Sequence, residues 1–492
     1  MKLRTAIDYI NGTAERLSPA LSDREVDSFV IDSREVQAGD VFFALSQPEY
    51  ANNGFNGEFE DATKFAAGAL EKGAAVCVLR RDRFDEHRAD LERFEDRLII
   101  VDDVIAALQR LAHRVYLNWD RPVVAITGSA GKTTAKELTA HVLAAGGRKV
   151  LKNIKNFNNG LGHPLTVLNL AKDPDYEVAV LEMGMSTPMH EIARLCRITP
   201  PDVSVVLNVL PVHVEHLGSI ENVAAAKAEI VEGMKPNGIA ILNADDHRVA
   251  AMASSSKGGV VTYGIQTEAD VTAKQIEYPS FGETSFTLET PSGQAKVLFP
   301  LNGTHNISNA LAAAAVGHVF GMSACEIAES LASVAPPPQR GEILRFAQGF
   351  TVVNDSYNSN PAALLSMVRT LIEGSAGAKR KIVVAGEMLE LGIGAAEIHQ
   401  QTGLEIGGLG IDKLIGVRGL AKDLVDGAVE AGLKDAEFAV DSNAAGDRLV
   451  QEIQPGDVVL VKGSRGVRTE NVITKLLEKF ELEANTDTAV AR

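Results

Sequence analysis

The stretch "AITGSAGKTTAKEL", residues 125–138, decides how the middle of the chain folds. The apolar run 123–127 predicts a buried strand, and "GSAG" at 128–131 predicts a turn whose backbone N–H groups can approach a ligand closely. A helix would follow at once and end at Gly146-Gly147. The start of a helix offers unpaired N–H groups and the positive end of its dipole, so this stretch predicts a phosphate site.

The side chains after the turn suit a nucleotide. Lys132 can reach the β- and γ-phosphates of ATP, and Thr133 can coordinate Mg²⁺. The usual consensus has a glycine where Ile126 stands, so the motif is a shortened variant; the alternative is an ordinary glycine turn before a helix. The candidate ATP contacts are Gly128, Ser129, Ala130, Gly131, Lys132, Thr133 and Thr134.

The composition limits the class of protein. The chain has 492 residues, 45% apolar and 23% charged, which fits a globular protein of about three domains. Its net charge of −17 argues against a nucleic-acid partner. Three scattered cysteines without a CxxC pair indicate neither a zinc site nor a disulfide framework, so we expect reduced thiols and a cytoplasmic location. We expect no membrane span and a monomer.

The pattern along the chain predicts an α/β fold of three domains. Residues 1–103 and 104–335 alternate strand-like and helix-like runs, and the proline run after Ala335 separates a third α/β unit at 336–492. The near-continuous apolar strands of the middle region predict a parallel sheet covered on both faces. Residues 46–61 read as a surface loop.

Polar residues follow many of these apolar runs. Ligands of open α/β sheets bind beyond the carboxyl ends of the strands, so we expect the chemistry at these positions. The residues concerned are Thr127, Glu182, Asn208, Asn243, Asp355, Glu387 and Lys462.

Several further residues could serve a metal ion, and each of them also has a plainer interpretation. Glu182 can hold Mg²⁺, or it is a solvated residue at a strand end. His213 and His216 have a spacing compatible with zinc, but no third ligand is evident, and one histidine near a magnesium–phosphate centre is the better hypothesis. Lys227 lies in a helix-like segment, where an exposed lysine is the simplest reading.

Two asparagine-rich turns complete the candidates. Asn306 and Asn309 would share a face of an alanine-rich helix, although helix capping explains one such asparagine. "NDSYNSNP" at 354–361 places polar side chains between a strand and a proline, where an Asn-Pro turn opening a helix is the alternative. Lys462 and Arg465, in a later glycine-bounded turn, could meet a carboxylate or phosphate.

In this order along nearly the whole chain, these motifs resemble those of the Mur ligases. The resemblance rests on "IDSREVQAGDVFFAL", "GSAGKTTAKE", "NFNNGLGHPLT", "LEMG", "NVLPVHVEHLGS", "AAAKAEI", "NADD", "GTHNISNA", "NDSYNSNP", "GEMLELG" and "VKGSRGVRTE". It implies an ATP- and Mg²⁺-dependent amide ligase of peptidoglycan synthesis. The run "DSYNSNP" favours the member that joins D-alanyl-D-alanine to UDP-N-acetylmuramoyl-tripeptide (UDP-MurNAc-tripeptide) through an acyl phosphate.

The resemblance also implies roles for the domains and for single residues. The domain 1–103 would bind the UDP substrate, 104–335 would bind ATP, and 336–492 would complete the ligase site. Catalysis would fall to Lys132, Lys227, His213 and Arg340, with Lys227 carbamylated. Thr133, Glu182, His213 and Lys227 would serve the metal, and Asn306, Asn309, Arg340 and Asp355 would contact ATP. The substrates would meet Ser33, Arg34, Asn158, Asn159, Tyr357, Asn358, Asn360, Lys462 and Arg465.

Three rival interpretations stay open. A folylpolyglutamate-synthase-like ligase would use another acceptor, but the N-terminal segment and "DSYNSNP" disfavour it. A nucleotide-dependent switch or transport ATPase would need no acyl acceptor, and the third α/β domain disfavours it. A non-catalytic relative is disfavoured because Lys132 and Thr133 are intact.

Overall fold

The computed structural model describes residues 1–483 apart from 54, 56–58, 155–156, 186–189, 212–216, 281, 336–338, 376 and 393. The chain packs as two compact units, each assembled from separate segments. Unit 1 consists of Met1–Gly128, Leu143–Val209 and Glu221–Thr262, and unit 2 consists of Ser129–Val142, Leu210–Ile220 and Tyr263–Arg492. The boundary predicted at 335/336 borders residues outside the described part, and the three-domain division stays a prediction.

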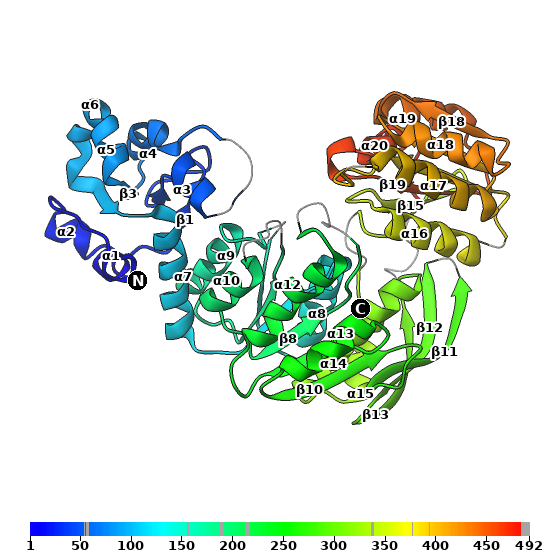
Figure 1. Cartoon of the computed structure of the whole chain (residues 1–492), viewed down its shortest axis with the longest axis horizontal. Coiled ribbons are helices and arrows are strands. Elements are labelled where there is room, and N and C mark those ends of the chain that lie inside the picture. Colours follow the sequence, from blue (N-terminus) through cyan, green and yellow to red (C-terminus); the bar gives the residue numbers. More distant parts are fainter. Residues whose placement is uncertain are drawn as a thin grey trace, which may run out of the picture. The chain divides into compact units, whose positions relative to one another are not determined.

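Unit 1 begins with a four-stranded parallel sheet in the order β1-β2-β3-β4 (Figure 1). Its core is formed by Phe42, Leu70, Cys77 and Leu79, all fully buried or nearly so. The elements are α1 Leu3–Ile10, α2 Pro19–Ser22, β1 Phe29–Val30, β2 Val41–Phe43, α3 Gln47–Asn52, α4 Ala66–Glu71, β3 Val76–Arg80, α5 Arg81–Glu86, α6 Arg88–Leu91 and β4 Leu98–Val101. The strands and helices predicted here are thus present, although β1 and β2 are short.

The segment 46–61 corrects one expectation, because it contains the helix α3 where we expected only a surface loop. The cause is a capping box: the Ser46 side chain and the Glu49 carboxylate each satisfy a backbone N–H at the start of this helix. The second Glu49 oxygen accepts from the Val104 N–H at 2.9 Å, so a buried carboxylate ties the segment to the helix that begins at Val104.

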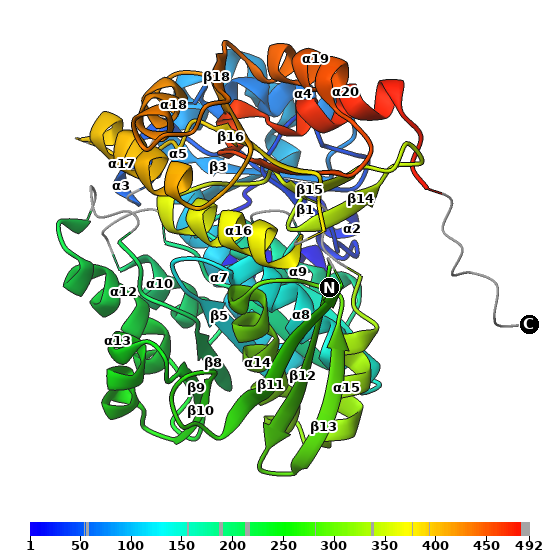
Figure 2. The ribbon, with the colours of Figure 1, turned by 90° about the vertical axis from the view of Figure 1, so that its right-hand side faces the viewer.

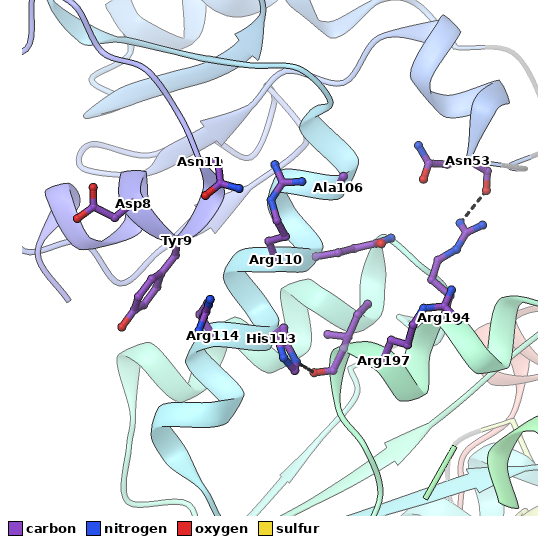
Figure 3. A pocket seen from close by; sticks show the side chains of 12 residues that line it. Asp8, Tyr9, Asn11, Asn53, Ala106, Arg110, His113, Arg114, Arg194 and Arg197 are labelled. Carbon is purple, nitrogen blue, oxygen red and sulfur yellow. Dashed lines mark hydrogen bonds between the residues drawn. The ribbon is translucent and has the colours of Figure 1, made fainter. Parts of the chain in front are cut away.

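A second, nine-stranded sheet contributes to unit 1 the strands in the order β10-β9-β8-β5-β7-β6. Every residue of β5 and β7 is buried, as expected for parallel strands covered on both faces. The elements are α7 Val104–Trp119, β5 Val123–Thr127, β6 Val150–Lys152, α9 Gly162–Lys172, β7 Val178–Glu182, α10 Glu191–Ile198, β8 Val203–Val206, α12 Ile220–Glu232, β9 Ile239–Asn243, α13 His247–Ala251 and β10 Gly259–Gly264. Figure 3 shows α7 in unit 1 with α1 and α10 on either side of it.

Unit 2 contains three long antiparallel strands that sequence reasoning did not identify: β11 Val271–Ser280, β12 Glu283–Thr290 and β13 Gly293–Phe299. The helices α14 Thr304–Val319 and α15 Ala324–Ala332 pack against them (Figure 2). Buried and exposed positions largely alternate along β13, the pattern of a sheet with one solvated face. The helix α8, Lys132–Ala145, starts in this unit.

The last part of unit 2 is a six-stranded sheet in the order β14-β15-β19-β16-β17-β18. The strand β14 is antiparallel to its neighbour, and the other strands are parallel. The elements are β14 Glu342–Arg345, β15 Thr351–Asp355, α16 Pro361–Gly374, β16 Arg380–Gly386, α17 Ala395–Gly408, β17 Lys413–Val417, α18 Ala421–Glu430, β18 Ala436–Ala439, α19 Ser442–Glu452, β19 Asp457–Lys462 and α20 Glu470–Lys479.

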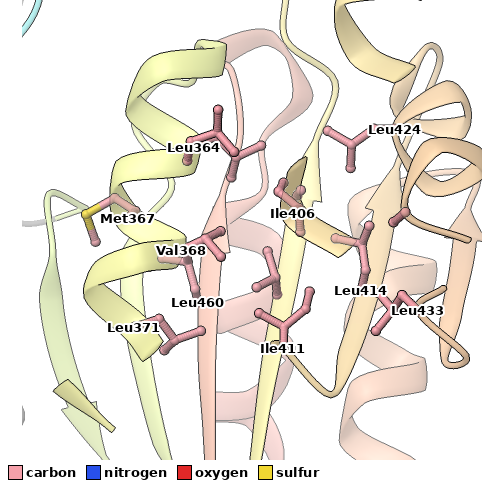
Figure 4. Close-up of a cluster of buried hydrophobic side chains, with 14 of the residues drawn as sticks. Leu364, Met367, Val368, Leu371, Ile406, Ile411, Leu414, Leu424, Leu433 and Leu460 are labelled. Carbon is pink, nitrogen blue, oxygen red and sulfur yellow. The ribbon is translucent and has the colours of Figure 1, made fainter. Parts of the chain in front are cut away.

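Two apolar clusters cover the faces of this sheet. Side chains of α16, α17 and α18, among them Leu364, Ile406 and Leu424, pack on one face around Leu414 and Leu460 (Figure 4). Side chains of α19 and α20 pack on the other face together with Phe346 and Phe350. The sheet is therefore buried on both sides, and ligands can reach it only at the ends of its strands. In the part of the chain that the structure describes, no helix has the length and apolar character needed to cross a membrane.

Candidate active site

The loop after β5 has the geometry of a phosphate cradle. Gly131 adopts a left-handed conformation with φ +83°, and α8 begins at Lys132. A Cβ on Gly131 would stand 2.6 Å from Oδ1 of Asn309, so only glycine fits beneath that amide. The predicted ATP residues of the loop and Asn309 of α14 are therefore brought together. This arrangement supports phosphate binding over a plain glycine turn.

Short hydrogen bonds fix the first residues of this loop. The Ser129 hydroxyl accepts from the Leu210 N–H at 2.9 Å and lies 3.2 Å from the Leu210 carbonyl, to which it donates. The Lys132 ammonium donates to the Ser129 carbonyl at 3.5 Å. This weak contact holds the lysine over its own loop, where a phosphate can replace the carbonyl as acceptor.

The end of β7, in unit 1, carries a second group of candidate residues. Glu182 lies beside Ile126 in the parallel register of β5 and β7, and its side chain is buried. The Asn158 amide donates to Glu182 Oε1 at 2.8 Å, and the Glu182 N–H donates to Asn153 at 2.6 Å. A Cβ on Gly184 would come within 2.9 Å of Asn158. The structure thus brings Glu182 and Asn158 together and contradicts a merely solvated glutamate.

Lys227 is 3% exposed on α12, so the exposed-lysine interpretation was wrong. On α12 the buried Val223, Ile230 and Val231 lie at helical spacing from Lys227, so the apolar pattern around the lysine indicates a buried face. A lysine that is almost completely removed from water needs a functional or electrostatic reason, because an unpaired buried ammonium is costly.

His213 and His216 lie outside the described residues, so the hypotheses about them remain predictions. Across the residues that the structure describes, no group of three or more His, Cys, Asp or Glu side chains could hold a metal ion.

The predicted substrate segment after β1 is held by an internal ion pair. Arg34 donates to both oxygens of Asp32, with its Nη2 at 2.6 Å from Oδ2, and this contact lowers the pKa of the Asp32 carboxyl. The Lys72 ammonium donates to the Ser33 carbonyl at 3.0 Å. Asn159 accepts from the N–H groups of Leu161 and Gly162, which shapes the turn before α9.

The asparagines of α14 lie inside the helix and do not cap it. The N-cap is Gly303, and Asn306 and Asn309 are both buried. The Asn306 amide donates to the Asn302 carbonyl at 2.8 Å. The cluster therefore forms one polar helix face in an otherwise apolar helix, as expected from its spacing.

The ends of β15 and β19 form a third group. Asp355 and Lys462 are register partners at the last positions of these parallel strands, and Lys462 Nζ lies 2.5 Å from Asp355 Oδ2. Lys462 also donates to the Asn358 carbonyl at 2.9 Å. Asn360 accepts from the Ala363 N–H and caps α16, as the plainer interpretation of this turn predicted.

Two arginines flank Tyr357 at the same sheet edge. The Arg340 guanidinium lies 4.1 Å from the centre of the Tyr357 ring, and that of Arg465 lies 5.4 Å away. A cation–π contact orients an arginine without neutralising its charge. Arg340 therefore remains suited to an anionic ligand, whereas Arg465 Nη1 also lies 4.0 Å from Glu470 Oε1.

Sequence reasoning missed a histidine that organises the "GEMLELG" turn. His399 on α17 is fully buried, its Nε2 accepts from the Met388 N–H at 2.9 Å, and its Nδ1 donates to the Ala395 carbonyl at 2.7 Å. The sequence carries no signal for this contact, because eleven residues separate donor and acceptor.

Comparisons with known proteins agree with this geometry. The model of the Mur ligase middle domain matches residues 126–317, and that of the Mur ligase glutamate ligase domain matches residues 339–465. A solved structure of MurF from Acinetobacter baumannii has a TM-score of 0.83 at 27% identity and covers 97% of this chain and 99% of its own. MurF from Thermotoga maritima in complex with ADP has a TM-score of 0.79 at 28% identity, covering 94% and 99%.

Curated relatives extend the match along nearly the whole chain. The UDP-N-acetylmuramoyl-tripeptide--D-alanyl-D-alanine ligase of Escherichia coli is 34% identical over 96% of this chain and 97% of its own length. The ligase of the same name from Bacillus subtilis is 32% identical over 88% of this chain and 96% of its own. Because two family models match most of its length and curated relatives cover nearly all of it, the chain belongs to the Mur ligase family.

Proposed function

We propose that the chain is an ATP-dependent ligase that joins D-alanyl-D-alanine to UDP-MurNAc-tripeptide and so forms the pentapeptide precursor of peptidoglycan. The observation that carries this proposal is the cradle of Gly131 and Lys132 at the start of α8, together with the buried Glu182 that ends β7 beside β5. The full-length match to ligases of this name specifies the two substrates.

ATP would be held by the loop Gly128–Thr134 and by α14. The N–H groups at the start of α8 and the Lys132 ammonium would neutralise the phosphates, as in other phosphate loops. Asn306 would face the adenine, and Asn309 supports the loop through Gly131. Arg340 and Asp355 would contact the phosphates and the ribose.

Thr133, Glu182 and Lys227 are the residues that would serve a magnesium ion. The Thr133 hydroxyl, the Glu182 carboxylate and a carbamate on Lys227 offer oxygen atoms, which Mg²⁺ prefers. We also assign His213 to this centre. A neutral Lys227 amine that adds CO₂ releases one proton and becomes an anion, which gives its burial a function. When bound, Mg²⁺ would offset the negative charge of the phosphates.

The chemistry is the formation of an amide at the expense of ATP. An oxygen of the terminal carboxylate of the tripeptide attacks the γ-phosphorus, the bond to the bridging oxygen breaks, and ADP leaves. The amine of D-alanyl-D-alanine then attacks the acyl carbon, phosphate leaves, and the nitrogen gives up a proton. Lys132 and Arg340 would bind the phosphoryl group throughout, so the protein contributes positioning and charge neutralisation.

The remaining candidate residues would bind the substrates. Ser33 and Arg34 would meet the uridine nucleotide, and Asn158 and Asn159 would meet the part of that substrate nearest β7. Around the C-terminal sheet edge the contacts would be Tyr357, Asn358, Asn360, Lys462 and Arg465. The domain roles given above, a monomeric state and a cytoplasmic location belong to the same proposal.

The decisive experiment measures phosphate release from ATP and Mg²⁺ with UDP-MurNAc-tripeptide, with and without D-alanyl-D-alanine. We expect release that requires both substrates and a UDP-MurNAc-pentapeptide product identified by mass. Release without either substrate would favour a switch or transport ATPase. Activity only with another amino-acid acceptor would place the chain with a sister ligase.

A further inference from the structure

A pocket in unit 1 that is lined by none of the residues assigned above contains four arginines. Its volume is about 650 Å³, and it lies between α1, α7 and α10 (Figure 3). Arg110 and Arg114 stand one turn apart on α7, and Arg194 and Arg197 stand one turn apart on α10. Tyr9 and His113 add two aromatic rings to the wall.

The positive charge of this pocket is not balanced by the protein. Among the described residues, no carboxylate forms an ion pair with any of the four guanidinium groups, and Asp8 is the one acidic residue in the lining. Like charges one helical turn apart repel each other, and here two such pairs share one cavity. The chain as a whole has a net charge of −17. A cluster of four arginines is therefore not what its overall composition would lead one to expect.

Neutral contacts hold the two deeper arginines in place. Arg110 donates to the Ile10 carbonyl at 2.8 Å, while its Nε is buried without a hydrogen-bond partner. Arg194 donates to the Asn53 carbonyl at 2.7 Å. Each of these bonds uses one of five guanidinium N–H donors, so both side chains are oriented and retain donors and their full charge. Arg114 and Arg197 are exposed at the rim.

We propose that this pocket binds a small ligand carrying two or more linked phosphate groups. Arginine binds phosphate oxygens through paired N–H donors, and two arginine pairs on facing helices match a diphosphate better than a single anion. The volume lies in the range of small-molecule sites, about 300–1,000 Å³. The Tyr9 ring offers a flat surface for a base, which makes nucleoside diphosphates the first class to examine.

The test is calorimetric titration of the full chain with inorganic pyrophosphate, ADP and UDP, in EDTA to remove divalent cations. Wild type is compared with the double variant Arg114→Gln/Arg197→Gln, whose side chains are exposed and whose loss should not disturb the fold. Arg121→Gln is the matched control, since Arg121 is an exposed arginine of unit 1 that does not line the pocket. Binding at the phosphate loop of α8, and binding of UDP at the proposed uridine contacts Ser33 and Arg34, persist in every variant and are subtracted.

We expect pyrophosphate binding at this pocket to weaken about tenfold in the double variant and to stay unchanged in the control, with a further loss as ionic strength rises. Stronger binding of ADP or UDP than of pyrophosphate, with the same loss, identifies a nucleotide as the occupant; equal binding identifies the diphosphate alone. Equal binding of all ligands to wild type and double variant overturns the proposal. So does an arginine-dependent affinity for poly-glutamate that exceeds that for pyrophosphate, since the pocket would then serve an acidic peptide.

Discussion

Two strands of the molecule, β7 and β15, end in an acidic residue, and the two carboxylates have different surroundings. Asp355 at the end of β15 meets the Lys462 ammonium, its register partner on β19, at 2.5 Å. Glu182 at the end of β7 has Ile126 as its register partner on β5, and its carboxylate accepts from the Asn158 amide. An amide orients a carboxylate without neutralising it, whereas an ammonium cancels its charge. The same sequence pattern therefore places one carboxylate against a lysine in unit 2 and the other against an asparagine in unit 1.

The largest effect should come from breaking the ion pair. In Lys462→Met the Asp355 carboxylate, whose side chain is 15% exposed, loses its cation, and we expect the free energy of unfolding to fall by about 3–5 kcal/mol. Urea denaturation followed by circular dichroism measures this loss. The double variant Lys462→Met/Asp355→Asn should recover most of it, because no uncompensated charge remains. A double variant as unstable as the single one would show that Lys462 acts through packing.

Glu182→Gln, unlike Lys462→Met, should lower the activity and leave the stability almost unchanged. The amide side chain keeps the shape and can still accept from Asn158, so the melting temperature should change little. Removing the negative charge should lower the rate of ATP-dependent ligation by about 10²–10³-fold, as for other groups that stabilise charge in a transition state. Steady-state kinetics across Mg²⁺ concentrations measures this loss. An activity within threefold of wild type would reduce Glu182 to a structural role.

The strands that bear these carboxylates, and their neighbours in the sheets, were predictable from the sequence. The reason is that β5, β7, β15 and β19 are nearly continuous apolar runs. Sequence reasoning missed β11–β13, whose mixed polar and apolar residues belong to a sheet with a solvated face. It also missed α3, because the capping box of Ser46 and Glu49 lies among asparagines and glycines that usually form loops. The phosphate loop was predictable because all its residues are contiguous.

The contacts between distant segments were not predictable. The Asn158–Glu182 and Asn309–Gly131 contacts join residues 24 and 178 positions apart, and no local pattern encodes such pairs. The four arginines of the pocket come from two helices whose packing is known only from the structure. Lys227 was judged exposed from its residue type, although Val223, Ile230 and Val231 at helical spacing mark its face of α12 as buried.

Glu49 extends the comparison to a third carboxylate, which has neither a cation nor a side-chain amide. It accepts from the backbone N–H groups of Ser46 and Val104, and burial raises its pKa to about 7. The folded state therefore holds a proton that the unfolded state releases above about pH 4.5. This contribution to stability is complete below pH 4.5 and is lost as the pH rises through about 7.

The matching experiment compares the pH dependence of unfolding in wild type and Glu49→Gln. The wild-type free energy of unfolding should decline relative to the variant between pH 4.5 and 7, with a slope of at most about 1.4 kcal/mol per pH unit. Glu92→Gln, at an exposed position of the same unit, should leave the slope unchanged. Parallel curves for wild type and Glu49→Gln would mean that Glu49 is ionised throughout this range.

The smallest expected effect comes from changing Tyr357, because the Arg340 guanidinium lies against its ring. Tyr357 orients Arg340 at 4.1 Å without reducing its charge, whereas the ammonium of Lys462 is already neutralised by Asp355. Tyr357→Leu should cost about 0.5–1 kcal/mol of stability, the size of a cation–π contact, and Tyr357→Phe should cost less because the ring remains. If Arg340 serves the phosphates of ATP, Tyr357→Leu should also raise KM for ATP a few-fold while Tyr357→Phe does not. Equal values of KM in both variants would mean that Arg340 does not depend on the ring of Tyr357 for its orientation.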